Sequence, residues 1–152
     1  MNRAKNVMMI IVAACLIFSM SSLAIAAEKG GPAEAKALLA KAVKLINEKG
    51  DKAYPEIHKA NGTFVIDENV YVYVFTADTA EVKAHPTNPK MLGNKYPKLP
   101  FVAKIMEMSK TKTTGNIEYK WSNPKTKKLD DKFAYYEKVP SQNVIAVCGY
   151  YK

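Results

Sequence analysis

Hydrophobic side chains recur every three or four positions between residues 32 and 49. The apolar positions of this segment are Leu38, Leu39, Ala42, Val43, Leu45 and Ile46. This spacing places them on one face of a helix, and Pro32 suits the first helical turn. Gly50 follows the last of them, as a C-terminal cap does. The pattern predicts an amphipathic helix over about 32–49, followed by a shorter helical piece within 51–60.

Alternation with a period of two, typical of strands, dominates most of the remaining chain. Residues 69–76 alternate and are rich in Val and Tyr, and a second, short strand is expected at about 80–85. Three further strands are expected at about 115–121, 132–139 and 143–151. Segments of turn composition, and no helical pattern, separate the last three strands. We therefore expect hairpins and antiparallel pairing there.

A second amphipathic helix is expected within residues 101–112, between the second and third strands. The predicted fold class is therefore α+β. It comprises a five-stranded antiparallel sheet, a long N-terminal helix, and an insertion of loop and helix over one face of the sheet. Such an insertion is a suitable place for a small pocket.

The first 26 residues carry the signals of export. A basic head precedes an unbroken apolar run at 7–20, and Ala24 and Ala26 form a small-residue cleavage site. The sequence predicts a signal peptide at 1–26, a single domain at 27–152 and a periplasmic location. Two alternatives stay open: an uncleaved segment that anchors the chain, and lipid attachment at Cys15.

Charge and cysteine content exclude some partners and covalent features. The formal net charge is +9, and removing Arg3 and Lys5 with the leader lowers it to +7. The lysines are scattered rather than clustered, so a solvated basic surface is expected and no nucleic acid partner. Cys148 is the single cysteine after residue 26, which excludes an internal disulfide. Its apolar neighbours indicate a buried thiol.

Signatures of catalysis are scarce in the sequence. It has no nucleophile elbow, phosphate-binding glycine loop or dinucleotide fingerprint. Its two histidines, His58 and His85, lack the spacing of metal ligands, and one cysteine cannot build a metal cluster. We therefore expect no enzyme, no cofactor and no metal.

Polar aromatic residues and hydrogen-bond donors gather in three segments, at 84–89, 118–124 and 132–138. Tyr119 and Trp121 lie two residues apart and so share one face of their strand. One lysine, several tyrosine hydroxyls and one histidine suit a small carboxylate, because lysine supplies charge while the aromatic rings exclude water. The alternative is that these rings only pack a sheet face and that the lysines are solvated.

The chain from Ala33 to Lys152 resembles the single Cache domain family of extracytoplasmic sensor modules. The resemblance starts with the opening helix and an Asn-Gly turn at 61–62, and continues through a hairpin with a His-Pro turn at 85–86. It ends with a Tyr-x-Trp-x-Asn-Pro strand, a Lys-x-x-Tyr strand and a closing Gly-x-Tyr. The residues of these last three motifs are Tyr119, Trp121, Asn123, Pro124, Lys132, Tyr135, Gly149 and Tyr151.

This resemblance implies a PAS-like sheet whose pocket binds short organic acids of the acetate or pyruvate class. The pocket lining it implies is His85, Tyr119, Trp121, Lys132 and Tyr135, with Tyr71 or Tyr73. The expected function is that of a periplasmic, sensor-type binding protein related to chemotaxis. The alternative is a structural or interaction module with no ligand pocket. Because the chain stops directly after its last strand, we expect a separate protein that presents its ligand to a membrane receptor or histidine kinase.

One position departs from the family pattern, and one matched motif conflicts with strand parity. Ala80 stands where a glycine is common, five residues before His85, so the hairpin turn is expected to differ. Lys132 and Tyr135 differ in parity, and only a bulge or a late strand start could turn both toward one face.

Overall fold

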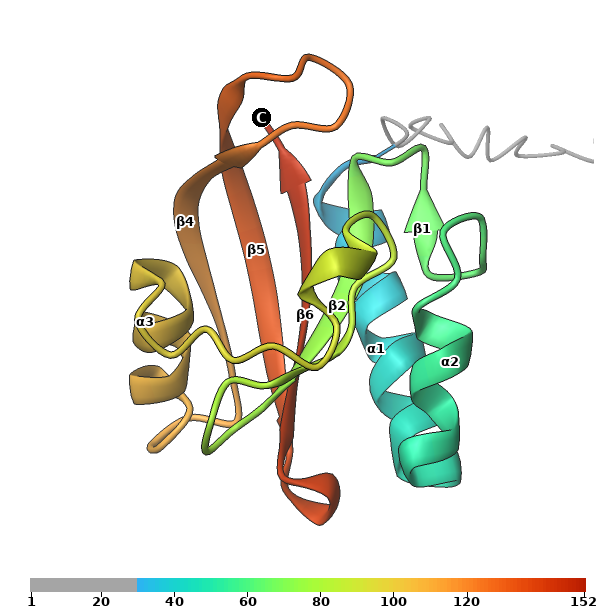
Figure 1. Ribbon diagram of the computed structural model, residues 1–152, viewed down its shortest axis with the longest axis vertical. Coiled ribbons are helices and arrows are strands. Elements are labelled where there is room, and N and C mark those ends of the chain that lie inside the picture. The colour runs from blue at the N-terminus through green and yellow to red at the C-terminus, as the bar shows by residue number, and fades with distance from the viewer. Residues whose placement is uncertain (1–29) are drawn as a thin grey trace, which may run out of the picture.

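The computed structural model describes residues 30–152. The predicted signal peptide at 1–26 and Cys15 therefore lie outside the described residues. The chain forms one antiparallel sheet with helices on both faces (Figure 1). The helical elements are α1 (Pro32–Lys49), η1 (Gly50–Ala53), α2 (Tyr54–Ile57), η2 (Pro89–Met91), α3 (Pro100–Met108) and η3 (Pro140–Gln142). The strands are β1 (Val65–Ile66), β2 (Val70–Thr76), β3 (Val82–Ala84), β4 (Thr114–Ser122), β5 (Leu129–Val139) and β6 (Val144–Tyr151).

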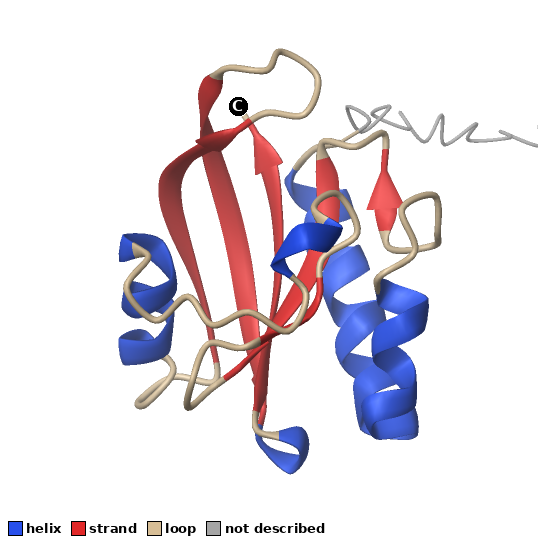
Figure 2. Cartoon of the chain, in the orientation of Figure 1, coloured by secondary structure: helices blue, strands red, loops and turns tan. Residues whose placement is uncertain are grey.

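The helix predicted at 32–49 is confirmed as α1. Its buried residues are Ala35, Leu38, Leu39, Ala42, Val43 and Ile46. They pack on β2, β5 and β6, so the apolar stripe faces the sheet as its spacing predicted. Gly50 ends the helix with φ of 56°, a left-handed conformation that glycine adopts without strain. Figure 2 shows α1 and α2 together on one side of the sheet, away from α3.

The predicted α+β class and antiparallel sheet are confirmed, with one strand more than expected. The strand order is β1-β2-β6-β5-β4, and β3 pairs with β2. The additional strand, β1, has two residues and pairs with the start of β2, while β3 pairs with its end. Two residues are too few for a visible alternation, so no periodic pattern predicts β1.

Strand β2 is buried on both faces of the sheet. Val70, Val72 and Val74 pack in the core beneath α1. The residues between them, Tyr71, Tyr73 and Phe75, belong to a second core on the opposite face. The period-two alternation thus separates valine from aromatic residues rather than apolar from polar ones.

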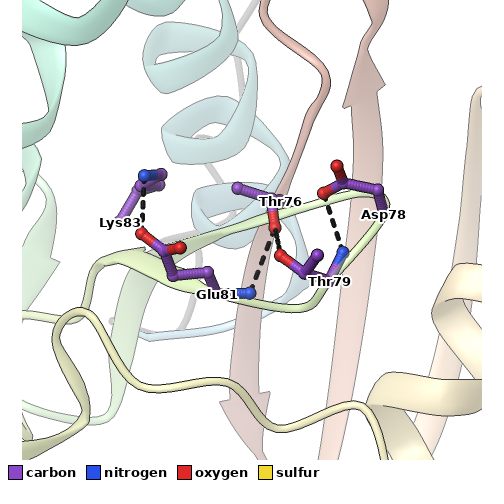
Figure 3. Close-up of polar contacts among 5 residues, drawn as sticks. All are labelled: Thr76, Asp78, Thr79, Glu81 and Lys83. Atoms are coloured by element: carbon purple, nitrogen blue, oxygen red, sulfur yellow. Dashed lines mark hydrogen bonds and ion pairs between the residues drawn. The ribbon is translucent and has the colours of Figure 1, made fainter.

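The β2–β3 turn is held by side-chain hydrogen bonds (Figure 3). The hydroxyl of Thr76 accepts the backbone N–H of Glu81 at 3.1 Å and lies 2.8 Å from the hydroxyl of Thr79. Ala80 is fully buried here with φ of 57°. It therefore keeps a left-handed conformation that favours glycine, and the Thr76 contacts offset the strain.

Replacing Ile46 with Ala should test the core beneath α1. The side chain is fully buried, so we expect its truncation to cost about 2–5 kcal/mol in the free energy of unfolding. Urea denaturation followed by circular dichroism measures this loss. Lys41→Ala, on the exposed side of the same helix, is the matched control and should change stability by less than about 0.5 kcal/mol. Equal losses in the two variants would contradict the packing described for α1.

Candidate functional site

The candidate site lies on the face of the sheet opposite α1. Strand register places Tyr119, Lys132 and Tyr151 side by side on β4, β5 and β6. Tyr71 and Tyr73 of β2 lie on the same face. The chain between β3 and β4 runs over this face and contributes His85 and residues of η2 and α3 (Figure 1). The predicted insertion over the pocket is thus confirmed.

A small cavity lies between the sheet and this insertion. The volume of this cavity is about 20 Å³ when it is counted as the space for the centres of water molecules. It has room for roughly one water molecule. Most of the wall is aromatic or aliphatic. The lining residues are Tyr71, Tyr73, Phe75, Ala80, Val82, His85, Met91, Tyr96, Phe101, Val102, Tyr119 and Trp121.

Lys132 is fully buried beside this cavity. Its Nζ has no hydrogen-bond partner among the described residues. It lies 3.7 Å from the ring centroid of Tyr71 and 4.7 Å from that of Tyr151, so the aromatic faces are its contacts. Burial lowers the pKa of Lys132 from its ordinary value, because the charged form is poorly solvated there. The cation–π contacts offset only part of this penalty.

Gly149 makes room for the lysine. A methyl group at Gly149 would lie 2.7 Å from Cε of Lys132 and 2.9 Å from the carbonyl oxygen of Phe133. Tyr151, two residues further along β6, covers the ammonium, and its hydroxyl donates to the carbonyl of Ser122 at 2.8 Å. Neither residue was predicted to belong to the site. The available signal was a glycine inside an apolar strand, which marks a close approach.

His85 is fixed through both its backbone and its ring. Its backbone N–H donates to Nδ1 of His58 at 3.3 Å, and its own Nδ1 accepts the backbone N–H of Asn88 at 3.1 Å. Because Nδ1 accepts, the neutral ring carries its proton on Nε2. Burial, and then the charge of Lys132, lower the pKa of His85 to about 3. The ring therefore stays a neutral donor at physiological pH.

Two tyrosine hydroxyls meet above the sheet. The hydroxyls of Tyr73 and Tyr119 lie 3.2 Å apart and share a hydrogen bond. Burial raises the pKa of both phenols, so both stay protonated and can donate. Phe101 of α3 stacks on Tyr119 at 4.2 Å between ring centroids and meets Trp121 edge-on at 5.1 Å. These contacts join the insertion to β4.

Six of the seven residues predicted to line the pocket lie on this face. They are His85, Tyr119, Trp121, Lys132, Tyr73 and Tyr71. Lys132 contacts the lining residue Tyr71 without lining the cavity itself.

The prediction that Tyr135 lies with them is wrong. Strand β5 pairs with β4 and β6 without a bulge, so residue parity holds and Tyr135 points to the α1 face. There it contacts Phe133 and Tyr150, and the ammonium of Lys36 lies 4.9 Å from its ring centroid. Tyr136 lies on the pocket side instead.

The requirements of a metal site and of a reactive thiol are not met within residues 30–152. This part of the chain holds no group of three or more His, Cys, Asp or Glu side chains that could bind a metal ion. Cys148 is fully buried, and burial raises the pKa of its thiol to about 12. The prediction of a buried thiol is confirmed. None of the helices in the described segment is both long and apolar enough to span a bilayer.

An antiparallel sheet with a helical layer on one face and a covered aromatic pocket on the other is the arrangement of a PAS-like fold. The family model of single Cache domain 2 matches residues 1–152, and the chain belongs to this family. Cache domains are sensory, ligand-binding modules. A search of curated proteins finds no significant match.

Solved structures of chemosensory domains share this fold. One is described as "Structural basis for carboxylic acid recognition by a Cache chemosensory domain", with a TM-score of 0.60 and 20% identity over 78% of this chain and 86% of that one. A periplasmic sensor domain of a chemotaxis protein has a TM-score of 0.64 and 18% identity, covering 84% and 98%. A methyl-accepting chemotaxis protein from Vibrio parahaemolyticus has a TM-score of 0.63 and 19% identity, covering 78% and 86%. At these identities the likeness establishes the fold.

The lowered pKa of His85 predicts a loss of stability in acid. The unfolded chain protonates this ring near the ordinary histidine pKa of about 6.5, whereas the folded protein does so only near pH 3. The unfolded state thus binds more protons between these values, and folding stability falls as pH drops through that window, by at most about 1.4 kcal/mol per pH unit. Denaturation curves of parent and His85→Gln, compared from pH 7 to 4, isolate this slope. Identical slopes would contradict the buried neutral ring.

Substituting Gly149 with Ala should disturb the site through Lys132. The added methyl overlaps Cε, so we expect the free energy of unfolding to fall by about 1–3 kcal/mol. In a Lys132→Ala background the side-chain overlap is gone, and the same change should cost less. Thermal or urea denaturation of the four proteins gives the coupling. Additive losses would show that only the backbone contact matters.

Proposed function

We propose that this protein binds a short carboxylate on the pocket face of its sheet. The observation that carries the proposal is the Lys132 ammonium, which is buried and has no hydrogen-bond partner among the described residues. A buried charge without a partner is costly, and an anion that binds beside it offsets that cost. A carboxylate supplies that charge and also accepts hydrogen bonds.

Neighbouring donors support an anion rather than a cation. Nε2–H of His85 is left to donate, since Nδ1 accepts from Asn88. The protonated hydroxyls of Tyr73 and Tyr119 can exchange their mutual hydrogen bond for one to a ligand. Among residues 30–152, no carboxylate lines the cavity to compete for Lys132. Rings of Tyr71 and Phe101 would shield the ion pair from water.

The cavity favours a very small acid. With room for roughly one water molecule, it admits a two- or three-carbon acid only if side chains move slightly. The best tiny ligands gain about 1.5 kcal/mol per heavy atom, which limits acetate to ~6 kcal/mol or a dissociation constant in the tens of micromolar. Pyruvate, which has more heavy atoms, could bind more tightly. The carboxylic acid recognition described for a Cache chemosensory domain is consistent with this class of ligand.

The same small volume favours a second candidate function. If the pocket is already filled by its own side chains, the domain is a structural or interaction module without a ligand. In that case the Lys132 charge would be a stability cost with no binding role. A ligand screen separates the two candidates.

The proposed setting is the periplasm. We propose that residues 1–26 act as a signal peptide and that 27–152 form the mature, non-enzymatic domain. Cache domains are extracytoplasmic sensors, and one of the similar structures is a periplasmic sensor domain, which supports this location. A membrane chemoreceptor or histidine kinase is the proposed partner for the ligand-bound protein.

Lys132→Met tests the ligand role directly. The substitution removes the charge and keeps the apolar stem, so the fold should persist and gain stability. Calorimetry with acetate, propionate and pyruvate at neutral pH should show at least tenfold weaker binding, since a charge-assisted hydrogen bond contributes about 1.5–3 kcal/mol. Lys112→Met, at an exposed lysine on the loop before β4, is the matched control and should bind as the parent does.

Two outcomes would overturn the proposal in different ways. If Lys132→Met binds carboxylates as well as the parent, the anion lies elsewhere and the ammonium has no ligand role. If the folded parent binds no short acid, the structural module is the better description.

A further inference from the structure

His58 lies outside the pocket yet reaches it through a backbone contact. It forms the C-cap of α2 and is half-buried, and it does not line the cavity. Its Nδ1 accepts the backbone N–H of His85 at 3.3 Å, across 27 positions of sequence. Helix α2 packs on β3, the strand that ends directly before His85. The contact thus joins the helical layer to the turn that carries a pocket donor.

Few backbone hydrogen bonds hold the His85 turn among the described residues. Strand β3 has three residues, and Pro86 carries no backbone N–H to add a further bond. The ring of His85 accepts the Asn88 N–H. The same ring packs on the rings of Tyr71 and Tyr73, at 5.3 and 5.5 Å between centroids. Its backbone N–H is held by His58. His85 is only 3% exposed, so water is poorly placed to replace a lost acceptor. His58 therefore fixes the backbone from which the His85 ring, and with it Nε2–H, extends into the pocket.

We infer that His58 is a positioning residue, whose Nδ1 fixes His85 so that Nε2–H faces the bound carboxylate. The inference rests on the proposed function, because it assigns His85 a role toward that ligand. It adds a contact outside the pocket on which affinity depends, and it connects the ligand to the layer formed by α1 and α2.

Two substitutions of His58 distinguish the effect of losing the hydrogen-bond acceptor from the effect of losing the volume of the ring. In His58→Asn, Oδ1 stands the same number of bonds from Cα as Nδ1 and can accept the same N–H. In His58→Leu, a branched side chain occupies similar space and accepts nothing. Ile57→Val is the matched control, because Ile57 is fully buried in the neighbouring position of α2 and belongs to the core beneath α1. It should lower thermal stability and leave affinity unchanged.

Calorimetry with acetate and pyruvate, together with the ¹H–¹⁵N signal of the His85 amide, tests the inference. We expect His58→Leu to weaken binding at least fivefold and to shift the amide signal. His58→Asn should stay within about twofold of the parent and keep a hydrogen-bonded amide. Parent-like binding by His58→Leu would overturn the inference, and so would equal weakening in both variants, which would assign the effect to the ring rather than the acceptor.

The two readouts also separate this inference from the proposed function. If the parent binds neither acid, the proposed function fails, and the amide signal alone decides the role of His58. An unchanged His85 amide in His58→Leu would then overturn the positioning role as well. A shift that His58→Asn restores would support it.

Discussion

The buried ammonium of Lys132 is the constraint on which the pocket face depends. Burial removes the hydration of the lysine charge, which costs free energy. The cation–π contacts with the rings of Tyr71 and Tyr151 offset only part of this cost. Gly149 leaves space for the aliphatic part of the Lys132 side chain, and the ring of Tyr151 lies over its ammonium. A sheet face used only for packing would be better served by an apolar residue here.

The two faces of the sheet differ in their chemistry. Beneath α1, valines of β2 and the apolar stripe of the helix form an ordinary aliphatic core. On the other face, aromatic rings carry hydroxyls that are buried but able to donate, and the insertion closes over them through Phe101. Because β2 contributes to both cores, the position of Tyr71 and Tyr73 is fixed by packing on the opposite side. A site preorganised in this way would lose little conformational entropy on binding the proposed ligand.

The elements with a regular hydrophobic period are the ones that the sequence predicts correctly. Helix α1 is found at the predicted residues, and the alternation of β2 and the shared face of Tyr119 and Trp121 hold in the structure. The family motif places Tyr135 on the pocket face against its residue parity, whereas the unbroken pairing of β5 keeps that parity and turns Tyr135 to the α1 face. Gly149 carries a sequence signal of close approach, as a glycine inside an apolar strand, but no signal says which side chain approaches it. The roles of Tyr151 and His58 could not be predicted, since each depends on contacts between segments distant in sequence.

The charge state of Lys132 offers the most direct test of the account. An NMR titration of its side chain, in the protein alone and with acetate or pyruvate in excess, measures this charge without any substitution. The account predicts that Lys132 loses its proton below the ordinary lysine value of about 10.5 in the protein alone. It also predicts that a bound carboxylate raises the pKa, because the anion stabilises the charged form. A Lys132 that titrates like the exposed lysines and does not respond to either acid would contradict the account.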